Sequence, residues 1–97
     1  MRHLNIIGPQ VRRLRSRRGW SQNQLAIKLQ IAGMDFATRK KVCKIESREV
    51  WVSDDDMLFL ARVLGVEPND LYPERILHSS RLYDAITAAK ASRHGDI

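Results

Sequence analysis

The chain has 97 residues, enough for one small domain, and its single cysteine, Cys43, excludes a disulfide framework within the chain. With 43% hydrophobic and 29% charged residues, the composition is that of a folded globular domain rather than a disordered one. No apolar run approaches the roughly 18–20 residues of a membrane span. The first ten residues, MRHLNIIGPQ, have no signal-peptide core, so we expect a cytoplasmic protein.

The net charge of +6 is distributed unevenly along the chain. Residues 1–52 carry twelve Arg and Lys against three acidic residues, a charge of +9, and residues 53–97 carry five against eight, a charge of −3. A basic half of this kind is typical of a protein that binds nucleic acid. The simpler alternative is that the charge only keeps the protein in solution.

The pattern predicts an all-α domain of five to six helices. We expect the first helix to begin at Pro9, whose fixed φ suits the first turn, and to end before Gly19. Val11 and Leu14 are its inward residues. The arginines of this helix are then expected to lie largely outside: Arg12, Arg13, Arg15, Arg17 and Arg18.

The second helix is expected to begin after Ser21, because Ser21 with Gln24 three residues later forms a capping box. The residues that we expect to be buried are Leu25, Ala26 and Leu29. Gly33 is the expected end of this helix, and Phe36, in the looser stretch that follows, is available to fill the core.

A third helix is predicted over about residues 38–47, with Thr38 as its cap. Val42 and Ile45 are its strongly apolar positions and must face the core. The outward residues are then Arg39, Lys40, Cys43 and Lys44. Like charges this close repel by a few tenths of a kcal/mol per pair, so the helix either faces a polyanion or is a solvated surface.

A fourth helix is expected from the Ser53 cap to Gly65, with three aspartates where the helix dipole favours anions. A short helical turn around Pro68 and a further helix over about 79–92 complete the prediction. We therefore expect a helical domain over 1–75 and a C-terminal helix and tail over 76–97, the latter a candidate dimerisation element.

Three fragments in this order resemble the lambda-repressor/Cro-like helix-turn-helix family, over about residues 6–73. They are VRRLRSRRGWSQNQLAIKL, TRKKVCKIE and LARVLGVEPNDLYP. The resemblance implies that Gln22 contacts a DNA phosphate and that Ala26 allows the second and third helices to cross closely. It also implies that Glu46 has a structural role.

Two features depart from the family pattern. The stretch from Leu29 to Glu46 is several residues longer than usual, so the turn between the second and third helices becomes a loop. In addition, Arg48 takes the place of a glycine that the family commonly has after the third helix.

The resemblance and the charge pattern together predict a transcriptional regulator, most simply a repressor, that reads the major groove of double-stranded DNA with the third helix. Arg39 is the first candidate for base contact and Lys40 the second; Lys41 and Lys44 suit phosphate contact. The complete expected DNA-contact set is Gln22, Asn23, Thr38, Arg39, Lys40, Lys41, Lys44, Arg17 and Arg18.

We also expect a homodimer on a pseudo-palindromic operator, because one short helix reads few base pairs. In the fourth helix the family pattern turns Phe59 and Val63 outward. With the C-terminal segment they give the expected interface: Phe59, Val63, Leu82, Tyr83 and Ile86.

Enzymatic, metal and cofactor roles are not expected. The histidines His3, His78 and His94 are scattered, and no nucleophile–base arrangement or phosphate-binding glycine loop occurs. The alternative function is a protein-binding module, such as the antitoxin of a toxin–antitoxin pair, whose main partner is a protein.

Overall fold

The computed structural model describes residues 3–74, 84–85 and 87–88. Its elements are α1 (Gly8–Arg17), α2 (Gln22–Ala32), α3 (Arg39–Glu46), α4 (Asp54–Leu64) and the 3-10 helix η1 (Pro68–Leu71). The described part of the chain contains no strand, which confirms the all-helical prediction. The described residues between 84 and 88 are helical, and the remainder of the helix expected over 79–92, with Leu82, Tyr83 and Ile86, lies outside the described residues.

The helix ends follow the sequence signals. Ser21 and Gln24 form the expected capping box at the start of α2, and Ser53 and Asp56 form another at the start of α4. The hydroxyl of Thr38 accepts the backbone N–H of Lys41 at 3.1 Å and caps α3. Gly33 and Gly65 end α2 and α4 in the left-handed conformation, in which glycine has no Cβ penalty.

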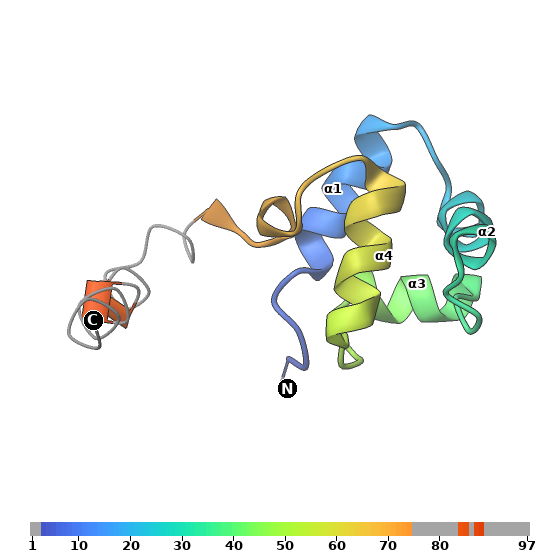
Figure 1. Cartoon of the computed structure of the whole chain (residues 1–97). Helices are drawn as coiled ribbons and strands as arrows, with labels where there is room; N and C mark the ends of the chain where they lie inside the picture. The colour runs from blue at the N-terminus through green and yellow to red at the C-terminus, as the bar shows by residue number, and fades with distance from the viewer. Residues whose placement is uncertain (1–2, 75–83, 86, 89–97) are drawn as a thin grey trace.

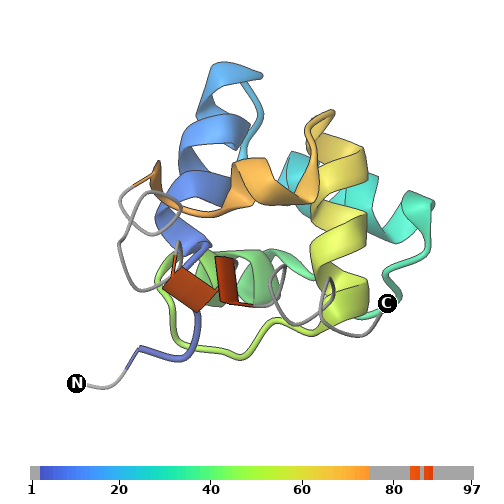
Figure 2. The same cartoon turned by 60° about the vertical axis from the view of Figure 1, so that its left-hand side comes forward.

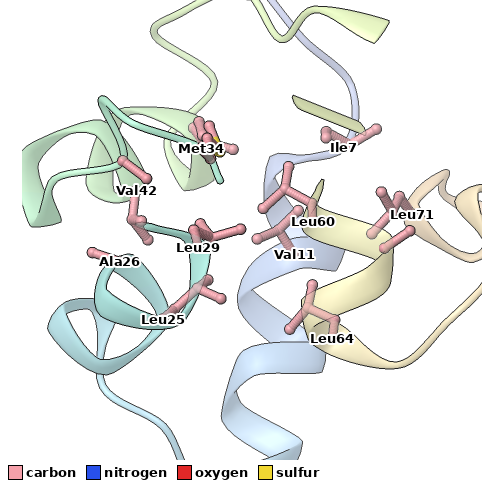
Figure 3. Close-up of a cluster of buried hydrophobic side chains, with 13 residues drawn as sticks. Ile7, Val11, Leu25, Ala26, Leu29, Met34, Val42, Leu60, Leu64 and Leu71 are labelled. Atoms are coloured by element: carbon pink, nitrogen blue, oxygen red, sulfur yellow. The ribbon is translucent and has the colours of Figure 1, made fainter. Parts of the chain in front are cut away.

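The helices pack around one hydrophobic core (Figure 3). η1 packs against both α1 and α4, and α3 lies at one end of the bundle, in contact with α1 and α2 (Figure 1). The fully buried large side chains come from every element: Val11, Leu25, Leu29, Val42, Ile45, Leu60, Leu64 and Leu71. The core therefore packs against one face of α3 and leaves the opposite face exposed to solvent.

The lengthened turn between α2 and α3 differs from the expectation for Phe36. Phe36 is 85% exposed, and Met34 and Ala37 are buried in its place. Gly33, at φ +117°, reverses the chain, and the backbone N–H of Met34 then donates to the Leu29 carbonyl at 3.0 Å. This bond turns Met34 inward. The side chain of Gln30 closes the turn by donating to the Ala37 carbonyl at 2.8 Å.

The outer face of α4 also differs from the expectation. Phe59 and Val63 are half-buried and pack against the core, whereas Leu58 is 60% exposed. A Cβ on Gly33 would lie 3.3 Å from the Phe59 ring, so the ring lies against the lengthened turn. The family has a shorter turn at this place, so the family pattern could not predict this contact.

Candidate nucleic-acid interface

The outward face of α3 gathers cationic side chains. Arg39, Lys40 and Lys44 line one hollow of about 440 Å³ together with Cys43 and Glu49. Positions 39, 40, 43 and 44 share one face of a helix because of its 3.6-residue period. On the opposite face Val42 and Ile45 are each 1% exposed. The four residues predicted to face outward are therefore brought together. Figure 2 shows the segment 47–53, which follows α3, on the same side of the domain.

Glu49 lies within this cationic hollow and was not identified from the sequence. The Ser47 hydroxyl donates to its carboxylate at 2.8 Å, and the Glu49 backbone N–H donates to the Lys44 carbonyl at 2.8 Å. Its position after the helix end depends on the path of the 47–53 segment, which no sequence signal specified.

Two other expected contact residues lie on the flank of α3. Lys41 is half-buried and lines a different hollow, of about 230 Å³, with Phe36, Asp55 and Asp56. Thr38 is exposed at the helix start, where its oxygen accepts the Lys41 N–H. Both remain near the N-terminal end of α3 but outside the group around Arg39.

A buried hydrogen-bond network fixes α3 against α1 and α2. Arg15 donates to both carboxylate oxygens of Glu46, at 2.6 and 3.0 Å, and to the Trp20 carbonyl at 2.7 Å. Gln22 donates to the same carboxylate at 3.1 Å. The expectation that Arg15 lies outside was wrong, because its long side chain reaches across to α3. The expected structural role of Glu46 is confirmed.

The charge of Arg15 is stable to pH. The hydrogen bonds to Glu46 raise the pKa of Arg15 above its ordinary value, and partial burial acts in the opposite direction without reversing this. Arg15 therefore stays charged at any physiological pH. Gln22 uses one of its two amide N–H donors on Glu46, which leaves the other available for a second partner.

The backbones of α1 and α3 approach closely at Gly8. A Cβ at this position would overlap the Ile45 carbonyl oxygen and lie 2.8 Å from that of Glu46. Asn5 supports the same contact, since its amide donates to the carbonyls of Ile45 and Val50 at 3.2 and 2.9 Å. Gly8 was not identified from the sequence; its place just before Pro9 is the signal that was available.

Arg17 and Arg18 do not line the hollow at α3. Arg18 donates to the Leu64 carbonyl at 2.9 Å, at the C-terminal end of α4, and lies over the Trp20 ring. Arg17 lines a separate hollow beside α1. The geometry gives no support to the DNA contacts expected of these two residues. Asn23, by contrast, is exposed at the start of α2, next to Gln22.

Comparison with known proteins identifies the arrangement. A family model described as a helix-turn-helix domain matches residues 6–72. The chain belongs to the helix-turn-helix family. It is a DNA-binding transcriptional regulator.

One solved structure is similar to this helix-turn-helix protein. It is the restriction-modification controller protein C.AhdI from Aeromonas hydrophila, with 32% sequence identity and a TM-score of 0.61. The match covers 71% of this chain and 96% of that chain. No curated protein sequence matches the chain. Among the described residues, no helix is long and apolar enough to cross a membrane.

Proposed function

We propose that the chain represses transcription by reading a double-stranded operator through the major groove with α3. The observation that carries this is the cluster of Arg39, Lys40 and Lys44 on the exposed face of a helix whose other face is buried. B-DNA's major groove admits an α-helix, and arginine donates two hydrogen bonds to O6 and N7 of guanine. We assign Arg39 and Lys40 to bases, and Lys41 and Lys44 to phosphates.

The start of α2 supplies the second set of proposed contacts. Gln22 and Asn23 lie in its first turn, where backbone N–H groups and the helix dipole favour a phosphate. Because Gln22 also bonds Glu46, the phosphate contact and the position of α3 are linked through one side chain. Thr38 can donate its hydroxyl proton to a phosphate while its oxygen caps α3.

The mode of control is proposed as repression because a bound protein can block a promoter without further contacts. The similarity to a restriction-modification controller protein supports a controlling role for this chain. No observation favours the protein-binding alternative or an enzymatic function.

We further propose that the protein acts as a homodimer. An eight-residue α3 is about 12 Å long, enough to contact only about four base pairs. Two copies related by a two-fold axis would read half-sites about 34–36 Å apart. The exposed apolar side chains of Phe36 and Leu58 support an apolar contact in addition to the proposed Phe59 and Val63. The C-terminal segment, proposed to form an extra helix, would supply Leu82, Tyr83 and Ile86.

The test is selection of bound sequences from a random pool of double-stranded DNA by the full-length protein. We expect an enriched pseudo-palindrome, bound in the nanomolar range and weakened steeply by salt. An unenriched pool, with weak binding equal for all sequences, would contradict the proposal.

A further inference from the structure

A second cationic surface lies beside α1, separate from the α3 face. It is a hollow of about 450 Å³ whose lining includes Arg13 and Arg17 from α1 and Arg48 from the segment after α3. On α1, position 13 is about 200° around the helix from the buried Val11, so this hollow lies on the outer side of α1. The contacts proposed for operator reading use none of these three arginines. A DNA contact was expected of Arg17 from the sequence, but Arg17 does not line the hollow at α3.

Two of the three guanidinium groups are oriented by hydrogen bonds. Arg48 donates from Nε to the Asn5 carbonyl at 2.6 Å, which leaves its two terminal nitrogens available. Arg13 donates to the Gln10 side chain at 3.3 Å, and Gln10 donates in turn to the Asp70 carbonyl of η1 at 3.0 Å. Side chains held in this way lose less conformational entropy when a ligand binds.

The three arginines have no carboxylate partner within the described part of the chain. Arg15–Glu46 is the one ion pair there, and Glu74, although it lines the hollow, forms no ion pair with these groups. Guanidinium groups without a carboxylate partner attract anions, and their planar fork matches phosphate oxygens.

Arg48 gives an independent indication. It is the one described non-glycine residue with positive φ, at +66°, a conformation that is unfavourable for any residue with a Cβ. Strained residues of this kind concentrate at functional sites. A glycine would avoid this strain. In this conformation the Nε bond to the Asn5 carbonyl holds the Arg48 side chain at the hollow.

We propose that this arginine hollow binds the phosphate groups of a small phosphorylated ligand, such as a nucleotide. Arg13, Arg17 and the terminal nitrogens of Arg48 bind the phosphate oxygens. Ile6 and Pro9 give the hollow apolar walls for the rest of the ligand. The volume is within the usual range for small-molecule sites.

The test measures binding of inorganic pyrophosphate to the full-length protein by calorimetry, with and without the double substitution Arg13→Gln/Arg17→Gln. We expect one pyrophosphate per chain and a loss of roughly tenfold or more in affinity in the double variant. Arg12→Gln, which removes one positive charge from the same helix outside the hollow, is the control and should bind as the parent does. Arg39→Ala should also bind pyrophosphate normally, which separates this site from the α3 face.

Three outcomes would overturn the proposal. They are no pyrophosphate binding, equal binding by the double variant, or weaker operator binding by the double variant when pyrophosphate is absent. The last would assign the hollow to DNA phosphates instead. Because Arg39 is not part of the hollow, failure of operator reading and failure of this site give different results.

Discussion

Arg15 and Glu46 form a two-point ion pair that joins α1 to the last residue of α3, with N–O distances of 2.6 and 3.0 Å. Their side chains are 13% and 3% exposed, so the pair is largely removed from water. Gln22 binds the same carboxylate, and the network therefore joins the first three helices at one point.

Removing one partner of this pair should destabilise the protein. We expect Arg15→Met to lower the free energy of unfolding by about 3 kcal/mol, because the Glu46 carboxylate stays buried with only Gln22 to bond it. Urea denaturation followed by circular dichroism measures the change. The double variant Arg15→Met/Glu46→Leu is the control and should recover most of the loss, since an apolar pair can replace a buried ion pair. Equal destabilisation in both variants would show that packing, rather than charge, explains the effect.

The close approach of α1 and α3 gives the second prediction. Gly8→Ala places a methyl group against the backbone carbonyls of Ile45 and Glu46, which cannot move as a side chain can. We expect a loss of about 1–3 kcal/mol in stability, measured by thermal unfolding. Gly19→Ala is the matched control. A Cβ at position 19 would have no other atom within 4 Å. The loss of stability then comes only from the positive φ of +72°, at a cost of about 1 kcal/mol.

Much of the fold was predictable from local chemistry. Ser21, Thr38 and Ser53 cap the helices that they were expected to cap, because a capping hydroxyl acts within three residues of its own position. The burial of Val42 and Ile45 followed in the same way from helical spacing. Each of these signals acts between residues that are close together in the chain, so the sequence alone is enough to predict the cap or the buried face.

The errors concern contacts between distant segments. The sequence shows that Arg15 is a charged residue on a helix, but not that a carboxylate lies 31 positions away across the bundle. In the same way, the choice between Phe36 and Met34 depended on the direction in which Gly33 turns the chain. Glu49 enters the cationic hollow only because of the path of 47–53. Each depends on tertiary geometry that periodicity does not encode.

The third prediction tests which residues of α3 contact bases and which contact phosphates. Arg39→Ala should weaken specific binding by roughly 1–3 kcal/mol and relax the preference at one base pair, as expected for a lost bidentate contact. Lys41→Ala should weaken binding to all sequences alike and reduce the salt slope by about one unit. Fluorescence anisotropy over a range of salt concentrations, on the selected operator and on single-base variants, measures both. If neither variant changes DNA affinity, the cationic face is only solvated.

The lengthened turn provides the fourth prediction. Met34→Ala removes a buried side chain and should cost about 2–5 kcal/mol of stability. Phe36→Ala changes an exposed residue two positions away and should alter the stability of the monomer by less than about 0.5 kcal/mol. Urea denaturation of the two variants at low protein concentration makes the comparison. A large loss in Phe36→Ala that grows with protein concentration would instead show that the ring is covered in an oligomer.

The last prediction separates the fold from its assembly. Within the described part of the chain, all buried core residues lie between Ile7 and Leu71, so a chain that ends at Glu74 should keep its helical fold. If the segment after it completes the dimer, the truncated chain should be monomeric, or dissociate at much higher concentrations than the full chain. Its operator affinity should then fall by orders of magnitude, because each half-site is bound alone. Sedimentation velocity of the full and truncated chains measures the association, and circular dichroism checks the fold. A truncated protein that remains dimeric would remove the C-terminal segment from the interface, and one that unfolds would show that this segment stabilises the monomer.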